Sequence, residues 1–194
     1  VRNGSLVVAQ PRDAADLARF AQRTERFEAI GAERIAELEP DLASRYHRAL
    51  FFPDEAHLDP RRALAALVDG LARQGVAVRF GIDLSPDAAP GDVVVDCRGF
   101  AARDALQDLR GVRGEMVMVR CLDVALTRPV RMLHPRIPLY VVPRGDGLFM
   151  IGATMIESER QGGASVRSTV ELLNAAFALH PAFGEAEVVE LGAD

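Results

Sequence analysis

The sequence lacks lysine and has only two cysteines, and each shortage excludes a class of site. All 23 basic residues are arginine, so the chain holds neither a Schiff-base lysine nor a phosphate loop of the Walker type. Cys97 and Cys121 have no metal-ligand spacing, which argues against a zinc site and a disulfide framework. So few cysteines favour a reducing, cytoplasmic compartment.

Three further absences argue against membrane, dinucleotide-binding and nucleic-acid-binding functions for this chain. No run of about 18 apolar residues and no signal peptide occurs, so we expect neither a membrane span nor export. The dinucleotide fingerprint Gly-x-Gly-x-x-Gly is missing. A net charge of -5 argues against a nucleic-acid surface.

The 194 residues, 49% of them hydrophobic, suit one compact domain or parts of two. Because the chain opens at Val1 on what resembles a strand already under way, we predict a piece of a longer protein.

The stretch from Leu139 to Met155 combines a hairpin signal with polar groups that a hairpin does not need. Two β-prone runs, 139–142 and 148–151, flank Arg-Gly-Asp-Gly, whose two glycines suit turn positions with positive φ. This pattern predicts two adjacent antiparallel strands. An ordinary core hairpin explains the apolar residues and the turn but leaves Gly152-Ala-Thr-Met155 unexplained. Small residues at a strand end let a backbone or a flat ligand approach closely, and a methionine beyond them offers a soft apolar contact.

The segment Asp54-Glu-Ala-His-Leu-Asp-Pro60 is dense in polar groups and has two interpretations. Two carboxylates and a histidine so close together could form a metal site or do acid-base chemistry, although the spacing matches no metal motif. Asp59 followed by Pro60 is instead typical of a helix N-cap with proline at the first helical position. We favour the capping role.

Hydrophobic periodicity predicts an α+β fold with a mostly antiparallel sheet. The apolar residues that we expect to face inward from the last helix are Val166, Val170, Leu173 and Phe177. The sheet is expected from regions 49–52, 116–119, 130–133, 139–143 and 148–152, covered on one face by helices at 60–74 and 165–179. Further strands are expected at 5–9, 76–80, 93–95 and 186–191, a further helix at 13–30, and a short helical turn before Pro40.

Val93-Val-Val95 is an all-apolar run that leads through Asp96-Cys-Arg-Gly99 into a predicted helix. Such a run is typical of a parallel strand buried on both faces. A strand, glycine turn and helix in this order aim backbone N–H groups at whatever lies above them, often a phosphate. An ordinary strand-to-helix turn is the more frequent explanation of a single glycine.

Together these motifs resemble the D-amino-acid oxidase / glycine oxidase family of FAD-dependent oxidoreductases. The resemblance covers nearly all of the chain, and the hairpin with the Arg-Gly-Glu strand is its most specific part. The segments that carry it, in order, are Glu39-Pro40, Asp54 to Pro60, Val93 to Gly99, Val112-Arg-Gly-Glu115, Tyr140-Val-Val-Pro143 and Gly152 to Met155. In that family a Gly-x-Gly-x-x-Gly unit binds FAD, and a second domain roofs the flavin and holds the substrate. The resemblance implies that this chain is the second domain with one strand of the first.

The resemblance also implies site residues. Tyr140 would point its hydroxyl toward a substrate carboxylate, with Thr154 and Met155 beside the substrate. Cys97, Arg98 and Gly99 would lie near the FAD phosphates or ribose, and the backbone of Ile82 or Leu84 would meet the adenine. The family's carboxylate-binding arginine lies in a stretch that would begin where this chain stops, and no catalytic side chain is implied, because FAD accepts the hydride.

Two functions therefore remain open. The chain is the substrate-binding part of a parent enzyme that oxidises the C–N bond of glycine, a D-amino acid or a secondary amine to an imino acid, and is itself inactive. Alternatively, it is a non-catalytic binding or assembly module whose sheet self-associates into a homo-oligomer. On the first hypothesis, residues 1–92 begin the substrate domain, 93–110 form a strand, turn and helix next to the FAD domain, and 111–194 complete the substrate domain.

Overall fold

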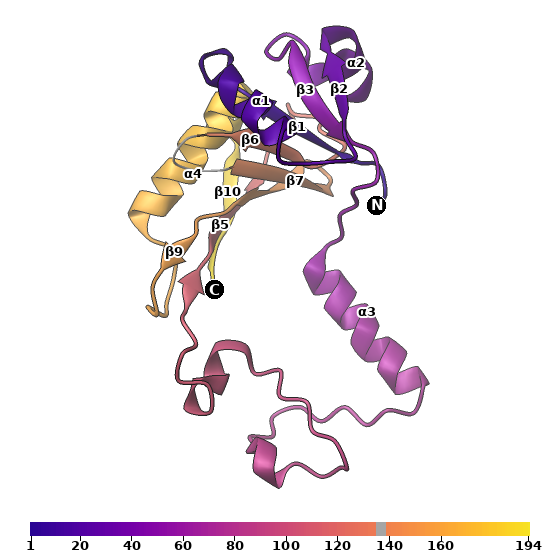
Figure 1. Cartoon of the computed structure of the whole chain (residues 1–194), viewed down its shortest axis with the longest axis vertical. Helices are drawn as coiled ribbons and strands as arrows, with labels where there is room; N and C mark the ends of the chain where they lie inside the picture. The colour runs from indigo at the N-terminus through magenta and orange to yellow at the C-terminus, as the bar shows by residue number, and fades with distance from the viewer. Residues whose placement is uncertain (135–138) are drawn as a thin grey trace. The chain divides into compact units, whose positions relative to one another are not determined.

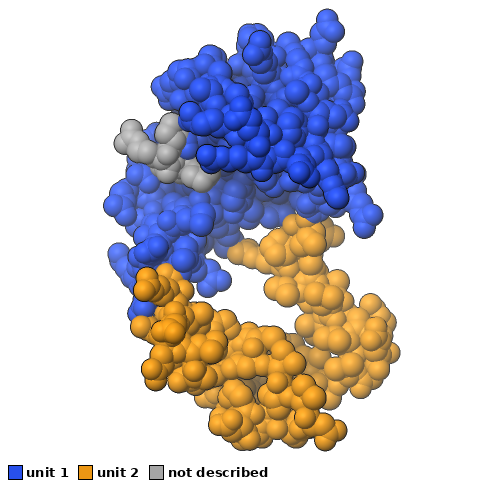
Figure 2. Space-filling model, in the orientation of Figure 1, with its two compact units in different colours: residues 1–57, 112–194 blue, residues 58–111 orange. Residues whose placement is uncertain are grey.

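The computed structural model describes residues 1–134 and 139–194, which form two compact units (Figure 1). The larger unit comprises residues 1–57 and 112–194, and the smaller comprises 58–111 (Figure 2). The domain divisions predicted at 92/93 and 110/111 stay predictions. Among the described residues, no helix is both long and apolar enough to cross a membrane.

An eight-stranded sheet dominates the described part of the larger unit, in the order β10-β5-β8-β7-β6-β1-β3-β2. Every neighbouring pair is antiparallel except β1 with β6, which is parallel. The mostly antiparallel α+β fold is thus confirmed, with all five predicted regions in one sheet. The strands are β1 (Ser5–Ala9), β2 (Glu28–Gly31), β3 (Arg48–Phe52), β5 (Glu115–Arg120), β6 (Val130–Leu133), β7 (Leu139–Gly145), β8 (Leu148–Gly152) and β10 (Glu187–Ala193). A separate small pair joins β4 (Val112–Arg113) to β9 (Ile156–Glu157).

The hairpin of β7 and β8 forms as predicted, because its turn residues adopt the backbone that glycine favours. Gly145 and Gly147 have φ of +90° and +68°. A side chain at Gly147 would also meet the backbone oxygen of Cys121 at 3.1 Å. The turn therefore needs glycine for both its conformation and its packing. It brings Tyr140 opposite Gly152 and Val142 opposite Met150.

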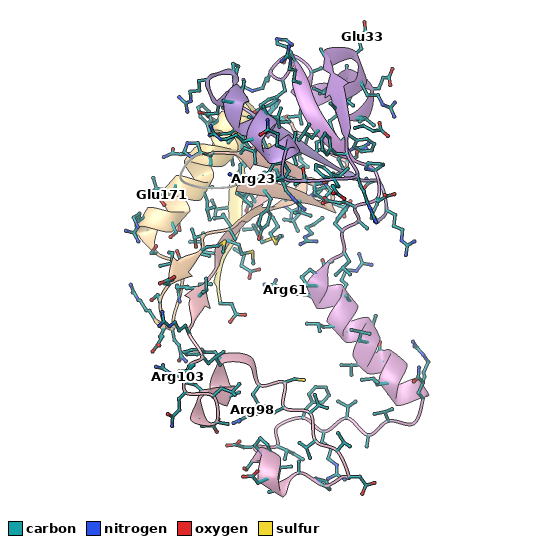
Figure 3. All side chains as sticks on the ribbon, in the orientation of Figure 1. Arg23, Glu33, Arg61, Arg98, Arg103 and Glu171 are labelled. Atoms are coloured by element: carbon teal, nitrogen blue, oxygen red, sulfur yellow. The ribbon has the colours of Figure 1, made fainter. Side chains whose placement is uncertain are left out.

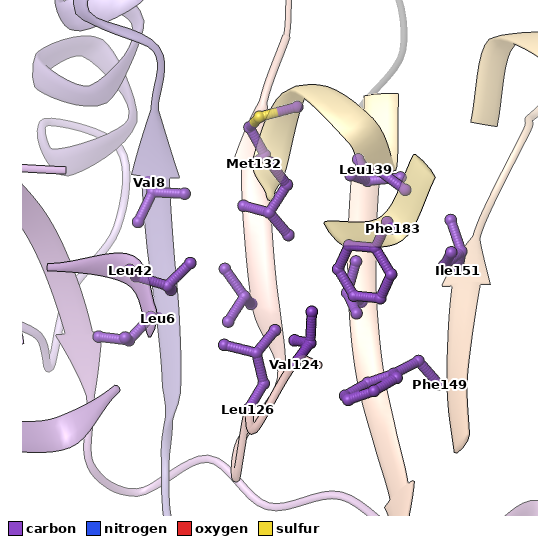
Figure 4. Packing of buried hydrophobic residues seen from close by; sticks show 14 of the residues in the cluster. Leu6, Val8, Leu42, Val124, Leu126, Met132, Leu139, Phe149, Ile151 and Phe183 are labelled. Carbon is purple, nitrogen blue, oxygen red and sulfur yellow. The ribbon is translucent and has the colours of Figure 1, made fainter. Parts of the chain in front are cut away.

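Helices cover both faces of the sheet, whereas we predicted cover on one. β1 is buried along its length: Leu6 and Val8 enter the main core, and Val7 enters a second, smaller core on the other face. Helices α2 (Ala32–Leu38) and α4 (Val166–Leu179) contribute to the main core, and α1 (Ala14–Ala21) covers the smaller core. Figure 4 labels Met132, Leu139, Ile151 and Phe183 among the side chains of the main core.

The helix predicted over 13–30 is too long. α1 stops at Ala21, Arg26 has φ of 60°, and β2 begins at Glu28. Apolar residues spaced for a helix also suit a strand in this short region, and pairing of Ala29 and Ile30 with β3 decides in favour of the strand.

The inward face predicted for α4 is wrong for Val166, Val170 and Phe177, whereas Leu173 is partly buried against the main core as predicted. The buried residues of α4 are Ser168, Leu172, Ala176 and Leu179, while Val166, Val170 and Phe177 are exposed. Two stripes of this helix have apolar residues at helical spacing, and periodicity cannot choose between them. The packing of α4 against β5, β7 and β8 selects the stripe with the smaller residues.

The smaller unit contains α3 (Pro60–Arg73), and its cap is confirmed. The Asp59 carboxylate accepts hydrogen bonds from the backbone N–H groups of Arg61 and Arg62 at 2.9 and 3.1 Å. α3 belongs to this unit and not to the unit with the sheet, so the cover of the sheet by 60–74 stays a prediction. Residues 76–80 and 93–95, predicted as strands, are not strands, and Val93 and Val95 are 82% and 76% exposed. A strand requires a hydrogen-bonded neighbour, and residues 58–111, all described, supply none.

Candidate functional site

One face of the central strands, opposite the main core, carries Tyr140, Met150 and Gly152. Because side chains alternate along a strand, Val141 and Ile151 enter the main core while Tyr140 and Gly152 face the other way. A Cβ at Gly152 would lie 2.8 Å from both Cζ and the hydroxyl oxygen of Tyr140. The tyrosine ring thus lies across the neighbouring strand in space that only glycine leaves open, and this explains the glycine that the core hairpin left unexplained.

The Tyr140 hydroxyl forms no hydrogen bond with any residue that the structure describes, although the side chain is half-buried. Burial raises the pKa of Tyr140, and the nearby Arg144 guanidinium opposes that rise. The hydroxyl is therefore neutral near pH 7 and available to donate a hydrogen bond.

Methionines form the apolar part of this face. Met118 lies opposite Met150 on neighbouring strands, and both are half-buried. Met116 lies over Gly192, where an added Cβ would come within 2.7 Å of its terminal methyl. One Arg144 nitrogen, Nη2, is 3.3 Å from Met150 Sδ. Thioethers are soft and adaptable, so this surface suits a small ligand with an apolar part.

Met155 and Thr154 follow β8 but differ in exposure. Met155 is 80% exposed, so its side chain is available to a ligand. Thr154 is buried, and its hydroxyl accepts a hydrogen bond from the Glu115 backbone N–H at 2.9 Å. The Thr154 hydroxyl therefore serves the sheet, and its contact with a substrate stays a prediction.

A charged group that our sequence analysis did not single out borders this face. Arg131, opposite Tyr140 on β6, contacts the Glu55 carboxylate at 3.1 Å, and the Ser5 hydroxyl donates to the same carboxylate. Glu55 belongs to the polar segment 54–60, so the density of polar residues in that segment was the sequence feature that could have indicated this group. Within residues 1–134 and 139–194, no three His, Cys, Asp or Glu side chains gather as a metal site would require.

A buried ion pair joins Arg113 and Glu115, two residues apart on either side of Gly114. Arg113 Nε donates to Glu115 Oε1 at 2.7 Å, and the side chains are 7% and 2% exposed. Glu115 also accepts from the backbone N–H and hydroxyl of Ser165, which caps α4. Burial raises the Glu115 pKa, but hydrogen bonds from Ser168, Arg113 and Ser165 outweigh burial and hold the pKa at about 2.

The predicted cofactor residues Ile82, Cys97, Arg98 and Gly99 all lie in the smaller unit. Ile82 and Cys97 are exposed, and Cys97 is a free thiol. The Arg98 guanidinium, labelled in Figure 3, donates to the carboxylates of Asp96 and Asp104 at 2.9 to 3.1 Å. Gly99 has φ of +60° and leaves the place of a Cβ open.

Comparison with known proteins gives a consistent result. Residues 1–192 match the family model described as FAD dependent oxidoreductase (DAO). The chain belongs to this family. It is 55% identical over 192 residues to a Rhizobium etli protein with the provisional name thiamine biosynthesis oxidoreductase ThiO, covering 99% of this chain and 58% of the relative. The chain thus spans somewhat more than half of that relative's length.

The solved structures of two oxidases share the fold of this chain. Glycine oxidase from Geobacillus kaustophilus is 23% identical, with a TM-score of 0.77 over all of this chain and 58% of that one. Iminodiacetate oxidase from Chelativorans sp. BNC1 is 21% identical, also with a TM-score of 0.77, over all of this chain and 59% of that one.

The family implies FAD, and the chemistry of the described residues fits part of such a site. Gly99 leaves room for a close backbone contact, as the phosphates of a dinucleotide require. The Arg98 side chain fits less well, because Asp96 and Asp104 already neutralise it. A contact with FAD through the backbone of 97–99 is therefore compatible with this structure, whereas an Arg98 ion pair with phosphate would have to displace a carboxylate.

Proposed function

We propose that the chain is the substrate-binding part of an FAD-dependent enzyme that oxidises the C–N bond of glycine, a D-amino acid or a secondary amine to an imino acid. The observation that carries the proposal is the Tyr140 hydroxyl, which is half-buried and without a hydrogen-bond partner among the described residues. A donor held in that state is typical of a binding site, because an unpaired polar group is costly in a structural role. Two structurally similar proteins, a glycine oxidase and an iminodiacetate oxidase, support substrates that contain both an amine and a carboxylate.

The chain's own residues bind and orient the substrate in this proposal. Tyr140 donates a hydrogen bond to the substrate carboxylate, and Met155 and Met150 contact the apolar part. FAD, when bound through contacts that include the backbone of 97–99, supplies the two-electron oxidant. Oxidation of the amine to an imine removes a hydride from the α-carbon and a proton from the nitrogen, so no nucleophilic side chain is required. Holding the reactants in register is the protein's main contribution.

Anaerobic reduction of the full-length FAD-loaded protein tests this proposal. Glycine, sarcosine and D-alanine are added separately, and the flavin absorbance near its visible maximum is followed in a stopped-flow instrument. We expect at least one of these amines to bleach the flavin, while acetate, which has the carboxylate but no amine, does not. If no small amine bleaches a flavin that dithionite does reduce, the proposed substrate class is wrong.

The alternative, a self-associating module, draws support from the edge strand β10. Its residues Val188, Val189 and Leu191 are each nearly half exposed. Exposed apolar residues on an open strand edge favour pairing with another chain. Light scattering on the chain and on the Val188→Glu variant measures self-association. A dimer that the substitution dissociates favours the assembly module, and a monomer at all concentrations excludes it.

A further inference from the structure

The two sequence neighbours of Met155, Thr154 and Ile156, are both hydrogen-bonded or paired to the segment 113–115. On one side of Met155, Thr154 and Glu115 exchange backbone and hydroxyl hydrogen bonds: the Thr154 N–H donates to the Glu115 oxygen at 3.2 Å, and the Thr154 hydroxyl accepts at 2.9 Å. On the other side, Ile156 pairs with Arg113 in the β4–β9 ladder. Met155 itself is 80% exposed. The neighbours of the methionine are therefore fixed while its side chain projects freely.

The side chains of Arg113 and Glu115 extend this hold to the loop after β9. Arg113 donates to the backbone oxygens of Arg160, Gly162 and Gly163 at 2.5 to 2.6 Å. Glu115 binds Ser165 at the start of α4. The guanidinium thus pairs with one carboxylate and three carbonyls, in a fork geometry that lysine cannot reproduce. Arg113 and Glu115 thus connect the segment carrying Met155 to the loop at 160–163 and to the start of α4.

Stability alone does not account for such a pair. A buried ion pair often contributes no more stability than apolar residues of the same volume, because both charges lose their hydration. The larger unit has a second buried pair, Glu39 with Arg128, at 2.9 Å and with Glu39 fully buried. That pair binds Thr127 and Asn3 and has no contact with 152–156 among the described residues. The Glu39–Arg128 pair is therefore a control for the Arg113–Glu115 pair, with the same chemistry but no described contact with 152–156.

We propose that Arg113 and Glu115 are positioning residues that fix the backbone of 154–156 and so hold Met155 in one place for the substrate. The inference rests on the proposed function, since Met155 is a substrate contact only if that function is right. The hold on the backbone is independent of it. Two measurements therefore examine the two parts separately.

The first measurement uses the chain without cofactor. Residue-resolved amide hydrogen exchange and the backbone order parameter of Met155 are compared between wild type, Glu115→Gln and Glu39→Gln. We expect Glu115→Gln to speed exchange at Thr154 at least roughly ten-fold and to lower the Met155 order parameter. Glu39→Gln should change neither beyond its effect on global stability. Equal effects of the two variants, or no effect of Glu115→Gln, would overturn the proposal. If Glu115→Gln does not fold, Arg113→Lys replaces it, with the same expectation.

The second measurement is a double-mutant cycle on KM in the full-length FAD-loaded protein. We expect Met155→Ala and Glu115→Gln each to raise KM several-fold with a smaller change in kcat, and their effects to overlap in the double variant. Glu39→Gln should leave KM unchanged. If the KM of the double variant rises by the product of the two single-variant increases, the two residues act independently and the positioning role is wrong. If Met155→Ala alone leaves KM unchanged, the substrate contact fails, and the exchange data still decide whether the backbone is held.

Discussion

Gly152 decides where the Tyr140 side chain can lie. The ring occupies the place where any other residue at 152 would put its Cβ, and its hydroxyl is left without a described partner. A tyrosine that served only the core would have its hydroxyl bonded to a neighbouring backbone group. The combination of a ring held by glycine and a donor without a described partner is the reason to assign Tyr140 to a binding site.

Replacing Tyr140 by phenylalanine in the full-length FAD-loaded protein tests that assignment. A hydrogen bond to a charged group contributes about 1.5–3 kcal/mol, so KM should rise by roughly one to two powers of ten. If the bond is equally strong in the ground and transition states, kcat should barely change. Steady-state kinetics and a melting curve on the same variant measure both. A normal KM with a lowered Tm would remove Tyr140 from the site.

Tyr46, the other tyrosine of the chain, is the matched control. It is buried, and its hydroxyl lies 3.4 Å from the Leu179 oxygen and accepts from Gln10. Burial raises the pKa of Tyr46 to about 12, although Arg45 opposes the rise. The unfolded chain loses this proton near pH 10 and the folded chain near 12, so stability should fall as pH rises through that window.

We therefore expect Tyr46→Phe to lower Tm, to leave KM unchanged and to weaken the loss of stability above about pH 10. Urea unfolding at about pH 9 and about pH 11, with and without the substitution, measures the last effect. Parallel changes in wild type and variant would mean that Tyr46 ionises normally.

At the scale of elements, Glu115 links β5, the segment after β8 and the start of α4. Its pKa in the folded chain, about 2, lies below the usual value of 4.5. A lowered pKa contributes stability that is present above pH 4.5 and is lost as pH falls toward 2. Wild type should therefore lose more stability than Glu115→Gln between about pH 5 and about pH 3. Urea midpoints at these two pH values measure the difference, and identical losses would show that Glu115 titrates normally in the folded chain.

For the whole molecule, we expect the 194-residue chain by itself to be colourless and to bind FAD weakly or not at all. No Gly-x-Gly-x-x-Gly segment occurs in the sequence, and the turn at Gly99 supplies only a small part of the contacts that a dinucleotide needs. An absorbance spectrum of the purified chain, with a titration of added FAD, measures this. A yellow preparation with one flavin per chain would contradict the expectation.

Local chemistry by itself determined several parts of this protein. The glycines of the turn at 145–147 and the Asp59 cap before Pro60 act over a few residues, so the sequence shows them directly. The same holds for the alternation that makes β7 and β8 neighbours and brings Tyr140 to the strand beside Gly152. Three of the segments that carry the family resemblance, 54–60, 140–143 and 152–155, lie on or next to these local features, which is why the amino-acid sequence alone indicates the family.

Tertiary packing decided the rest, because the competing local choices are nearly equal in energy. Both apolar stripes of α4 have helical spacing, and contact with the sheet selects the one with Leu172 and Ala176. Residues 28–31 become a strand because β3 offers them hydrogen-bond partners, and 93–95 find none within residues 58–111. Arg113 and Glu115 become a clamp on Met155 only when the loop at 160–163 and Ser165 close over them. Contacts between segments about 40 to 50 residues apart leave no periodicity in the sequence, so only the folded chain reveals them.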